Sequence, residues 1–521
     1  LELLDDAFLI FVLPSPDLLH QSIAADVVAG LSLQLEQALL HHGLGGDPGV
    51  VGARLPEGVG ALHPVPADEQ VLHHVVHGVP EVQGAGHVRQ GHHDHVALLA
   101  VVGDRAEGLG VEPALVDPAL EGSRSADVCV VGAGFTGVAT ALTLAERGFS
   151  VALVEANRVG WGASGRNGGQ LINGIGGLSK IAKKRGRDYE SMLWDLKWRG
   201  NDIIYDRVEK YGIQCDFKSG FLEVATKPSH VSYFDEFAAE REKHNFPYRY
   251  EIWDRETTRA NLGTDAFHGG FVCYRDGHLH PLNLCIGEAR AAHELGVQVF
   301  EQSPVTGIEH GRRPRVTTAT GYVEADSVVL AGNAYSLLEP KHLSNLVFPA
   351  GSYIIGTEPL ADDVVNEINP QDVAVCDTNE VVDYYRLSAD KRLLYGGACN
   401  YSGRDPASIK SFILPRMLRV YPQLRNVRID FEWGGKIGIV LNRIPAVGRI
   451  NGNVYYCQGY SGHGVNATHV MGEVMADAIG GTMERYDLFA DMGHFRLPGS
   501  QWIGNQIIAL GMLYYKIKDR L

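Results

Sequence analysis

The stretch ADVCVVGAGFTGVATALTLAERGFSVALVE, Ala126–Glu155, constrains the fold more than any other part of the chain. Its first apolar run, DVCVV, predicts a short strand buried in a parallel sheet. Three glycines in a GxGxxG pattern follow, at Gly132, Gly134 and Gly137. Helix-forming residues come next, and a second apolar run ends at Glu155. This order predicts a βαβ unit of a doubly wound α/β fold that binds a dinucleotide.

Each residue type in the pattern has a physical role in holding a dinucleotide. Gly132 permits the tight turn, Gly134 lets the backbone approach the pyrophosphate, and Gly137 lets the helix pack closely on the strand. The helix N-terminus supplies unpaired N–H groups and a partial positive charge. We expect Glu155 to accept hydrogen bonds from the ribose hydroxyls of the adenosine. FAD and NAD share this pattern, so it does not decide between them.

Two further glycine-rich segments favour FAD. Its ring system extends beyond the dinucleotide site, and a loop with few side chains can lie against a bulky ligand. The segment VGWGASGRNGGQ, residues 159–170, contains five glycines, and the strand-like DSVVLAGNAYS ends in a turn at Gly332. Besides Gly332, the residues of the first segment that we expect to contact FAD are Ser164, Gly165, Arg166, Asn167 and Gly168.

A third such segment is NVYYCQGYSGHGVNATHVMGEVMADAIGG, residues 453–481. Its pattern predicts a strand, a glycine turn and a helix. The N-terminus of that helix would place N–H donors and a positive dipole end where they could hold the N1/C2=O edge of a reduced flavin. The expected flavin contacts are Gly459, Ser461, Gly462 and Gly464.

Together these segments resemble the FAD-dependent D-amino-acid-oxidase-like amine oxidoreductases over about residues 124–500. The matching runs are VVGAGFTGVATALTLAERG with Glu155, GASGRNGG, DGHLHPLNLCIGEARAAHELGVQVFEQSPVTGIE, VVLAGNAYS, WGGKIGIVLNRIPAVGR and GYSGHGVN. Within that family, GASGRNGGQ, the WGG…NRIPAVGR run and the tail LPGSQWIGNQIIALGMLYYKIKD look most like the group that oxidises gamma-glutamylputrescine.

The resemblance implies an α/β fold, α+β overall, with a Rossmann-like FAD-binding domain and a mainly antiparallel substrate-binding domain, both discontinuous. Strand-like runs such as GFLEVATK and VVDYYRLS suit the second domain. Some relatives hold FAD covalently through a His after the first βαβ unit. Residues 156–175 contain no His, so noncovalent FAD is implied. The expected FAD-binding ranges are 124–212, 270–340 and 430–485, the substrate-binding ranges 213–268 and 345–429, and the C-terminal tail 486–521.

The resemblance further implies that a primary amine of a gamma-glutamylated polyamine is oxidised to an aldehyde, ammonia and hydrogen peroxide. Hydride would pass from the carbon bearing nitrogen to flavin N5, so the amine must be neutral. A free alkylamine has a pKa of about 10, as lysine does, and burial must therefore lower it. The partners implied are a small amine and either molecular oxygen or another electron acceptor.

Aromatic and arginine side chains are candidates for contact with this substrate. Tyr384, Tyr385 and Trp433 could enclose the reacting carbon, and ordinary sheet packing is the alternative for each. The glutamyl carboxylate could be clamped by a guanidinium. Arg386 is the first candidate and Arg166 the second, and Arg386 could equally be a solvated strand residue.

Two further side chains, Lys436 and His463, could stabilise the superoxide-like state that forms when oxygen reoxidises the flavin. A surface lysine and a packed histidine are the alternatives. The sequence shows no Ser-His-Asp set or paired carboxylates that would suggest hydrolysis. It also has no His or Cys cluster at metal-ligand spacing, so no metal site is predicted.

Residues 1–122 have an unusual composition. They hold 17 of the 62 acidic residues, 11 of the 22 histidines and three arginines, but no lysine, tyrosine, tryptophan or methionine. An accessory domain, a disordered tail and upstream sequence in a wrong reading frame remain open, and we favour the last. We expect no function there. The remaining residues carry 45 acidic against 43 basic side chains, which does not suggest nucleic-acid binding.

The sequence indicates a cytoplasmic location. Its seven scattered cysteines form no CxxC pair and suit reduced thiols. The first residues make a poor secretory signal, and no apolar run is long enough to span a bilayer. The segment WIGNQIIALGMLYYKIKDRL predicts an amphipathic helix that packs on its own domain, with peripheral membrane contact as a lesser alternative.

Two alternative functions stay open at this point. One is a glycine, sarcosine or D-amino-acid oxidase or dehydrogenase of the same family. The other is a non-catalytic dinucleotide-fold protein that binds a protein partner. The glycine loops GASGRNGG and GYSGHG argue against the second.

Overall fold

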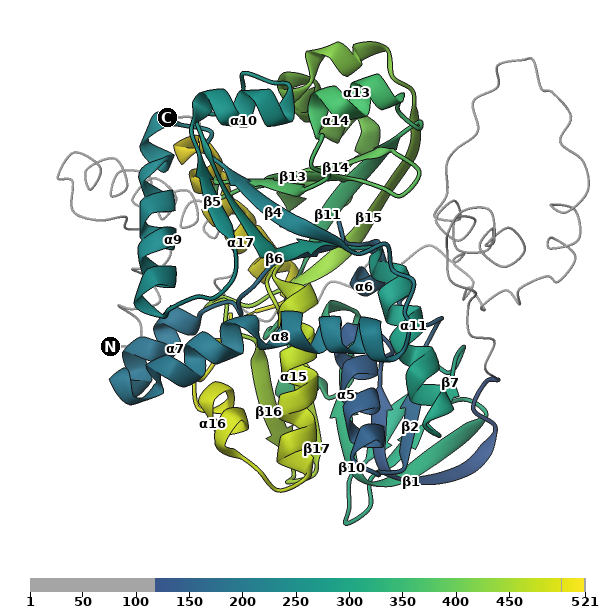
Figure 1. Ribbon diagram of the computed structural model, residues 1–521. Helices are drawn as coiled ribbons and strands as arrows, with labels where there is room; N and C mark the ends of the chain where they lie inside the picture. Colours follow the sequence, from purple (N-terminus) through teal and green to yellow (C-terminus); the bar gives the residue numbers. More distant parts are fainter. Residues whose placement is uncertain (1–117, 498, 520–521) are drawn as a thin grey trace, which may run out of the picture. The chain divides into compact units, whose positions relative to one another are not determined.

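The computed structural model describes residues 118–497 and 499–519, and in this part of the chain the strands form two sheets (Figure 1). The first sheet has eight strands, with β1 between β10 and β2, and the pairs β17–β10, β10–β1, β1–β2 and β2–β7 are all parallel. Its strands are β16 (Ala446–Ile450), β17 (Val454–Gln458), β10 (Gly321–Leu330), β1 (Gly122–Val131), β2 (Val151–Val154), β7 (Gln298–Phe300), β8 (Gly307–Glu309) and β9 (Arg315–Thr317).

Four helices pack beside the parallel strands, and their apolar faces form the largest core of the described part. They are α5 (Phe135–Glu146), α8 (Glu190–Lys210), α11 (Pro281–Glu294) and α15 (Gly464–Ile479). The α5 helix is buried from Phe135 to Leu144 because α11 and α15 pack on it (Figure 1). The close approach of α15 requires Gly472, since a Cβ there would lie 2.8 Å from the Cβ of Ala139.

The second sheet has nine strands, and its strand pairs are antiparallel except for β12 with β4. The α14 helix (Ile409–Val420) packs near β11, β14 and β15, and side chains of the helix and the sheet form an apolar core between them. That core includes Tyr385, whose ring stacks on Tyr395 at a centroid distance of 5.4 Å. The strands are β15 (Ile429–Ile439), β11 (Phe348–Thr357), β14 (Leu393–Asn400), β13 (Asp383–Leu387), β12 (Ala374–Asp377), β4 (Lys218–Val224), β6 (Gly270–His278), β3 (Gln170–Leu171) and β5 (Tyr250–Trp253).

Three strands lie in a different sheet from the one that their sequence ranges suggested. The strands β3 and β6, and β15 apart from its first residue, fall within the ranges expected for the FAD-binding domain, yet all three pair in the second sheet. Position along the chain therefore does not decide which sheet a strand joins. The strand β6, for example, is hydrogen-bonded to β4 along most of its length. The domain boundaries themselves stay a prediction.

The fold also begins earlier than residue 124. Leu120 is fully buried in a core with Phe300 and Val323, and its N–H donates to Ser303 Oγ at 2.8 Å. Gly122 already pairs with Gly321 in the first sheet. A protein that starts at Ser123 would therefore lose core contacts, and a truncation should keep residue 118 onward. The unusual composition noted above falls almost wholly on residues 1–117, which lie outside the described residues.

The remaining helices surround the two sheets. Of the described helices, none is long and apolar enough to cross a membrane. The last one, α17 (Gln501–Lys518), buries Ile508 and Met512 but exposes Trp502 and Leu510. Its peripheral membrane contact stays a prediction. The other helices are α6 (Ala163–Arg166), α7 (Leu178–Arg185), α9 (Ser232–Lys243), α10 (Arg255–Leu262), α12 (Pro340–Leu343), α13 (Asp362–Ile368) and α16 (Glu484–Ala490).

Candidate active site

Two glycines, one in the turn after β1 and one in the first turn of α5, fix the geometry where the strand passes into the helix. Gly132 has a φ of +105°, and a Cβ there would lie 3.1 Å from the carbonyl of Ala331. A Cβ on Gly137 would lie 1.8 Å from the carbonyl oxygen of Gly132. Since backbone atoms cannot move aside, these glycines keep the turn tight and leave the start of α5 close to the ends of β1 and β10.

Glu155 follows β2 and is held by the main chain beside this turn. Its Oε2 accepts from the N–H of Ala133 at 2.7 Å, and its Oε1 accepts from the N–H of Asn157 at 2.8 Å. Burial raises the pKa of Glu155, and these backbone hydrogen bonds oppose the rise. The carboxylate therefore has a defined position, as an acceptor for ribose hydroxyls requires.

The predicted loop at residues 159–170 meets the start of α5 through Ser164. The Ser164 Oγ accepts from the N–H of Phe135 at 2.9 Å, so it lies at the helix end that we expect to face a pyrophosphate. Asn167 holds the loop in shape, because its Oδ1 accepts from the N–H of Gly169 and its Nδ2 donates to the carbonyl of Ser164. Gly165 is required as well, since a Cβ would lie 2.4 Å from the carbonyl oxygen of Gly160.

Arg166 joins this loop to the second sheet. Its Nε donates to the Trp161 carbonyl at 2.7 Å, and its guanidinium lies 4.7 Å from the centroid of the Trp161 ring. Trp433 of β15 donates from its Nε1 to the Arg166 carbonyl at 2.9 Å. Burial lowers the pKa of Arg166. The hydrogen bonds to Trp161 and from Trp433, together with the ring contact, hold the loop in place. Arg166 therefore already has protein partners without a ligand.

A glycine turn lies between β17 and α15, in the order of strand, turn and helix that the sequence predicts. Ser461 and Gly462 have φ values of +54° and +97°, and α15 begins at Gly464 without a side-chain cap. Gly459 donates its N–H to Asn333 Oδ1 at 3.0 Å, which ties the turn to the segment that follows Gly332. The first N–H groups of α15 therefore have no side-chain acceptor, and an anionic or carbonyl edge of a ligand could take that place.

His463 stands at this helix end, and its side chain is exposed. Enough protein nevertheless surrounds the ring that desolvation, followed by the positive charge of Arg443, lowers its pKa. The ring is therefore neutral at neutral pH.

Tyr384 lies on the face of the second sheet that meets the glycine loop. A Cβ on Gly168 would lie 2.6 Å from its ring, and one on Gly396 would lie 2.5 Å from it. Its hydroxyl pairs with Ser352 Oγ at 3.2 Å. Burial raises the pKa of Tyr384, so the hydroxyl stays protonated. Tyr385 instead faces the core on the other side of the sheet, which excludes it from the site.

Arg386 contacts the same loop from β13. Its side chain is 4% exposed, and it donates from Nε to the Gly168 carbonyl at 2.6 Å and from Nη1 to the Leu387 carbonyl at 3.0 Å. Burial lowers its pKa to about 10, and the carboxylates of Asp216 and Asp372 oppose this. The guanidinium thus remains charged and supports the loop.

Lys436 approaches the site with its main chain. Its N–H donates to the hydroxyl of Tyr335 at 2.8 Å. Residues alternate between the faces of a strand, so its side chain lies on the opposite face of β15 from Gly435, the residue that packs against Arg166. The structure therefore does not bring the Lys436 ammonium to the face that carries Tyr384.

Sequence analysis missed Trp161, Asn333, Tyr335 and Ser352. Trp161 and Tyr335 form an edge-to-face pair at 5.8 Å. The signal for three of them was their place within, or directly after, a predicted glycine segment. Ser352 gave no local signal, because only strand pairing brings it to Tyr384.

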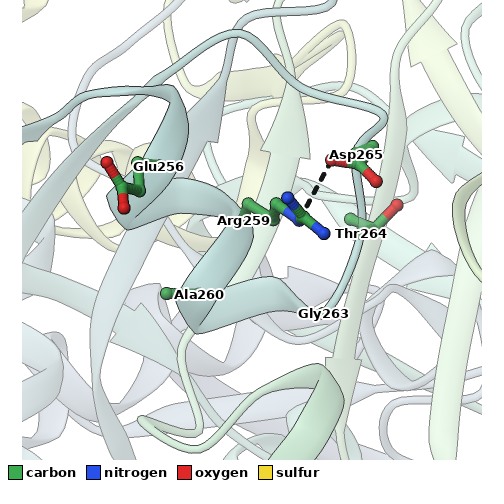
Figure 2. Close-up of a pocket in the computed structure, with 6 residues that line it drawn as sticks. All are labelled: Glu256, Arg259, Ala260, Gly263, Thr264 and Asp265. Carbon is green, nitrogen blue, oxygen red and sulfur yellow. Dashed lines mark ion pairs between the residues drawn. The ribbon is translucent and has the colours of Figure 1, made fainter.

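A surface pocket of about 340 Å³ lies elsewhere, on α10 and the turn that follows it. Figure 2 shows its lining, in which Arg259 and Asp265 form an ion pair with 3.1 Å between Nε and Oδ1. The lining contains none of the predicted site residues, and we assign it no role. Within the described residues, no group of His, Cys, Asp and Glu could hold a metal ion.

The arrangement fits FAD in three respects: a glycine turn that Cβ atoms would fill, a half-buried carboxylate beside it, and an uncapped helix N-terminus near the second sheet. The model of the family described as FAD dependent oxidoreductase, or DAO, matches residues 127–478. The chain belongs to this family. It is therefore an FAD-dependent oxidoreductase, and both the predicted family and the α/β fold class are confirmed.

Two proteins are similar to the chain over most of their own length. The gamma-glutamylputrescine oxidoreductase of Escherichia coli K12 is 42% identical over 405 residues, which cover 77% of this chain and 95% of that protein. A probable oxidoreductase, OrdL, of Haemophilus influenzae is 42% identical over 411 residues, covering 77% of this chain and 94% of that protein.

The fold also agrees with a solved structure. Glycine oxidase from Geobacillus kaustophilus superimposes with a TM-score of 0.58 at 20% identity, and the match covers 72% of this chain and 100% of that one. At this identity the match shows a shared fold only. Membership of an oxidoreductase family argues against the non-catalytic alternative.

Proposed function

We propose that the chain oxidises a primary amine, with gamma-glutamylputrescine as its substrate. The 42% identity to the Escherichia coli oxidoreductase, over 95% of that protein, is the observation that carries the proposal. The overall reaction takes up one molecule each of amine, oxygen and water and yields the aldehyde, ammonia and hydrogen peroxide. We propose that the enzyme works in the cytoplasm, since all seven cysteines are free thiols.

FAD, when bound, supplies the acceptor for the hydride that leaves the amine carbon. We propose that it binds noncovalently and that the main chain of the β1–α5 turn holds its pyrophosphate. Glu155 would bind the ribose hydroxyls, and Ser164 would contact the pyrophosphate. The start of α15 would hold the ring edge. The full set of proposed FAD contacts is Gly132, Gly134, Gly137, Glu155, Ser164, Gly165, Arg166, Asn167, Gly168, Gly332, Gly459, Ser461, Gly462 and Gly464.

The protein's own part in the chemistry is to bind the amine in its neutral form. Tyr384 is protonated and hydrogen-bonded to Ser352, so it offers an uncharged aromatic wall. Trp433 lies at the other end of the same region, fixed by its bond to the Arg166 carbonyl. Such a wall disfavours the ammonium form, because a charged group loses its hydration there.

Arg386 is better suited to positioning than to clamping a carboxylate. A clamp needs two parallel donors free to face the ligand. The bonds from Arg386 to the carbonyls of Gly168 and Leu387 already use Nε and Nη1. We therefore propose that Arg386 holds Gly168 against the Tyr384 ring. Lys436 is left without a proposed role, and His463, being neutral, would act as a hydrogen-bonding group and not as a positive charge.

A glycine, sarcosine or D-amino-acid oxidase of the same family is the competing function. Such an enzyme must bind a carboxylate next to the oxidised carbon. Arg386 already donates to two main-chain carbonyls, so it is poorly placed to bind such a carboxylate. A primary amine whose carboxylate lies far from the oxidised carbon therefore suits this chain better than an amino acid.

Anaerobic titration of the FAD-loaded protein with gamma-glutamylputrescine tests the proposal. We expect the flavin absorbance near 450 nm to bleach in proportion to the added amine, and hydrogen peroxide to appear when air is admitted. Glycine, sarcosine and D-alanine serve as the comparison substrates. Turnover of any of these with no bleaching by gamma-glutamylputrescine would exclude the proposed substrate and favour the competing function. Bleaching without peroxide would indicate another electron acceptor.

A further inference from the structure

Glu223 lies on the face of the second sheet that carries Tyr384. On β13 Tyr384 pairs directly with Cys376 of β12, and Cys376 pairs in turn with Glu223 of β4. Directly paired residues place their side chains on one face of a sheet. The three side chains therefore form a row across neighbouring strands. The glycine loop runs over the same strands, because Gln170 Nε2 donates to the Val375 carbonyl at 2.9 Å.

The Glu223 carboxylate has no hydrogen bond or ion pair within the described part of the chain. Burial is the main reason that its pKa rises to about 7. Glu223 is half-buried, and a carboxylate that has lost part of its hydration is stabilised by a cationic partner. The unpartnered carboxylate on the face that carries Tyr384 is therefore available to a cation of a ligand.

Two cations and one acid surround Glu223, and within the described residues none of them makes a hydrogen bond or ion pair with it. Arg241 of α9 donates to the Phe237 carbonyl and lies over the ring of Phe271 at 4.5 Å, while its Nε has no hydrogen-bond partner and its charge lowers the pKa of Glu223. Lys197 of α8 pairs with Glu240 at 2.6 Å. The third group, Asp276 of β6, is an acid that raises the pKa of Glu223 further and accepts from Asn173 and Asn201. Arg241 and Lys197 lower the pKa of Glu223 less than burial raises it, so a cation from the substrate would still meet a carboxylate without an ion pair.

The spacing in the row matches the length of the proposed substrate. Neighbouring strands lie about 4.8 Å apart, so two strand steps separate Glu223 from Tyr384 by about 10 Å. In gamma-glutamylputrescine about nine bonds separate the oxidised carbon from the α-ammonium nitrogen. Nine bonds equal three residues of extended chain, or about 10–11 Å.

We propose that Glu223 is a specificity-determining residue whose carboxylate binds the α-ammonium of a gamma-glutamyl amine, while the amine to be oxidised lies beside Tyr384. The proposal rests on the proposed function and names the group that selects its substrate. An ammonium beside the carboxylate keeps Glu223 ionised, and the bound pair satisfies both charges in a partly dehydrated region. Amines that lack a second cation at that distance would leave the carboxylate unpaired and bind more weakly.

The test compares gamma-glutamylputrescine with glutarylputrescine, which has the same length and carboxylate but lacks the α-ammonium. For Glu223→Gln we expect KM for gamma-glutamylputrescine to rise about 10–100-fold, as expected when a charge-assisted hydrogen bond is lost. We expect kcat to change little, and KM for glutarylputrescine to stay within about twofold of the wild-type value. The preference of the wild type for the ammonium-bearing substrate should therefore collapse.

Glu251→Gln is the matched control, because Glu251 lies in the same sheet on β5 and bonds to Arg249 and Trp253. It should leave both KM values unchanged. Flavin absorbance and melting temperature of Glu223→Gln show whether the fold is intact, and Glu223→Asp should restore part of the preference.

Equal changes in KM for both substrates, or no change in either, would overturn the role of Glu223. A wild-type enzyme that fails to oxidise gamma-glutamylputrescine would overturn the proposed function itself. The two failures are distinguishable, because the wild-type assay reports only the second.

Discussion

The two sheets contribute to the site in different ways. The first sheet offers main-chain atoms: the turn at Gly132, the backbone that holds Glu155, and the start of α5. The second sheet offers side chains, chiefly Tyr384 and, as proposed, Glu223. Both sheets need glycines where a Cβ would clash, but the atoms that the Cβ would meet are different. A Cβ on Gly137 would meet a backbone carbonyl, whereas a Cβ on Gly396 would meet an aromatic ring.

This difference corresponds to two kinds of ligand. FAD is a ligand of fixed structure, and a main-chain cradle suits such a ligand because it depends little on side-chain choice. An amine substrate differs between family members, and side chains on a rigid sheet can be exchanged without changing the fold. Changes in the first sheet should therefore affect FAD binding, and changes in the second should affect turnover of the amine.

The largest effect is expected for Gly137→Ala. The added methyl would lie 1.8 Å from the Gly132 oxygen, and its two nearest neighbours are backbone atoms of Gly132, so the turn must distort. Overpacking typically costs 1–3 kcal/mol, and a contact this short with backbone should reach or exceed about 3 kcal/mol. We expect FAD affinity to fall by at least about 100-fold, measured by flavin fluorescence during titration of the apoprotein.

Gly307→Ala provides the control for Gly137→Ala. Gly307 lies in β8 of the same sheet, and a Cβ there has no atom within 4 Å. Its FAD affinity should equal that of the wild type. Normal FAD binding by Gly137→Ala would show that the main-chain cradle is not the FAD site.

An intermediate effect is expected for Gly396→Ala in the second sheet. The methyl would lie 2.5 Å from the Tyr384 ring, which also lies against Gly168 and has little room to shift. We expect kcat/KM for the amine to fall about 10–100-fold, equivalent to 1–3 kcal/mol of overpacking, with FAD content unchanged. Tyr384→Phe is the milder comparison, because it loses only the hydroxyl bond to Ser352. Loss of FAD from Gly396→Ala would remove the division of roles between the sheets.

The βαβ unit could be predicted from sequence because its signals are local. Gly132, Gly137 and Glu155 fall within 24 residues, and their spacing alone indicates what they do. The same holds for the turn before α15. The contact of Arg386 with Gly168 could not be predicted, since 218 residues separate them and only the pairing of β13 within the second sheet brings them together.

The sequence also could not predict which side of the second sheet each strand residue faces. The run DYYRL predicts a strand, yet nothing in it says which of Tyr384 and Tyr385 faces the core. The structure decides this by packing Tyr385 on Tyr395. Glu223 had a local signal that was passed over: in GFLEVATK it is an acid between apolar residues of a strand, and an acid in that position requires an explanation.

The smallest effect is expected from His278, a buried titratable group at the end of β6 in the second sheet. Burial, followed by the charge of Arg386, lowers its pKa to about 3, while the unfolded chain has about 6.5. Below pH 6.5 the unfolded state therefore binds a proton that the folded state refuses, and stability falls as pH falls. The loss approaches 1.4 kcal/mol per pH unit, or about 1 kcal/mol between pH 7 and 5.5. Glu223 and Asp377 act in the opposite direction, because burial raises their pKa values to about 7.

The variant His278→Gln isolates this contribution from the opposing acids. Glutamine can still donate to the Asp372 carbonyl, which His278 Nε2 contacts at 2.7 Å, but it does not titrate. Melting temperatures measured by circular dichroism at pH 7 and 5.5 should therefore fall less for the variant than for the wild type. A parallel fall in both proteins would mean that folding does not shift the pKa of His278, which would then be protonated in the folded state at pH 5.5, with Asp372 as its partner, 3.6 Å from Nε2 to Oδ1. The end of β6 would then stabilise the positive charge of His278. The second sheet would in that case hold an ion pair at a buried position.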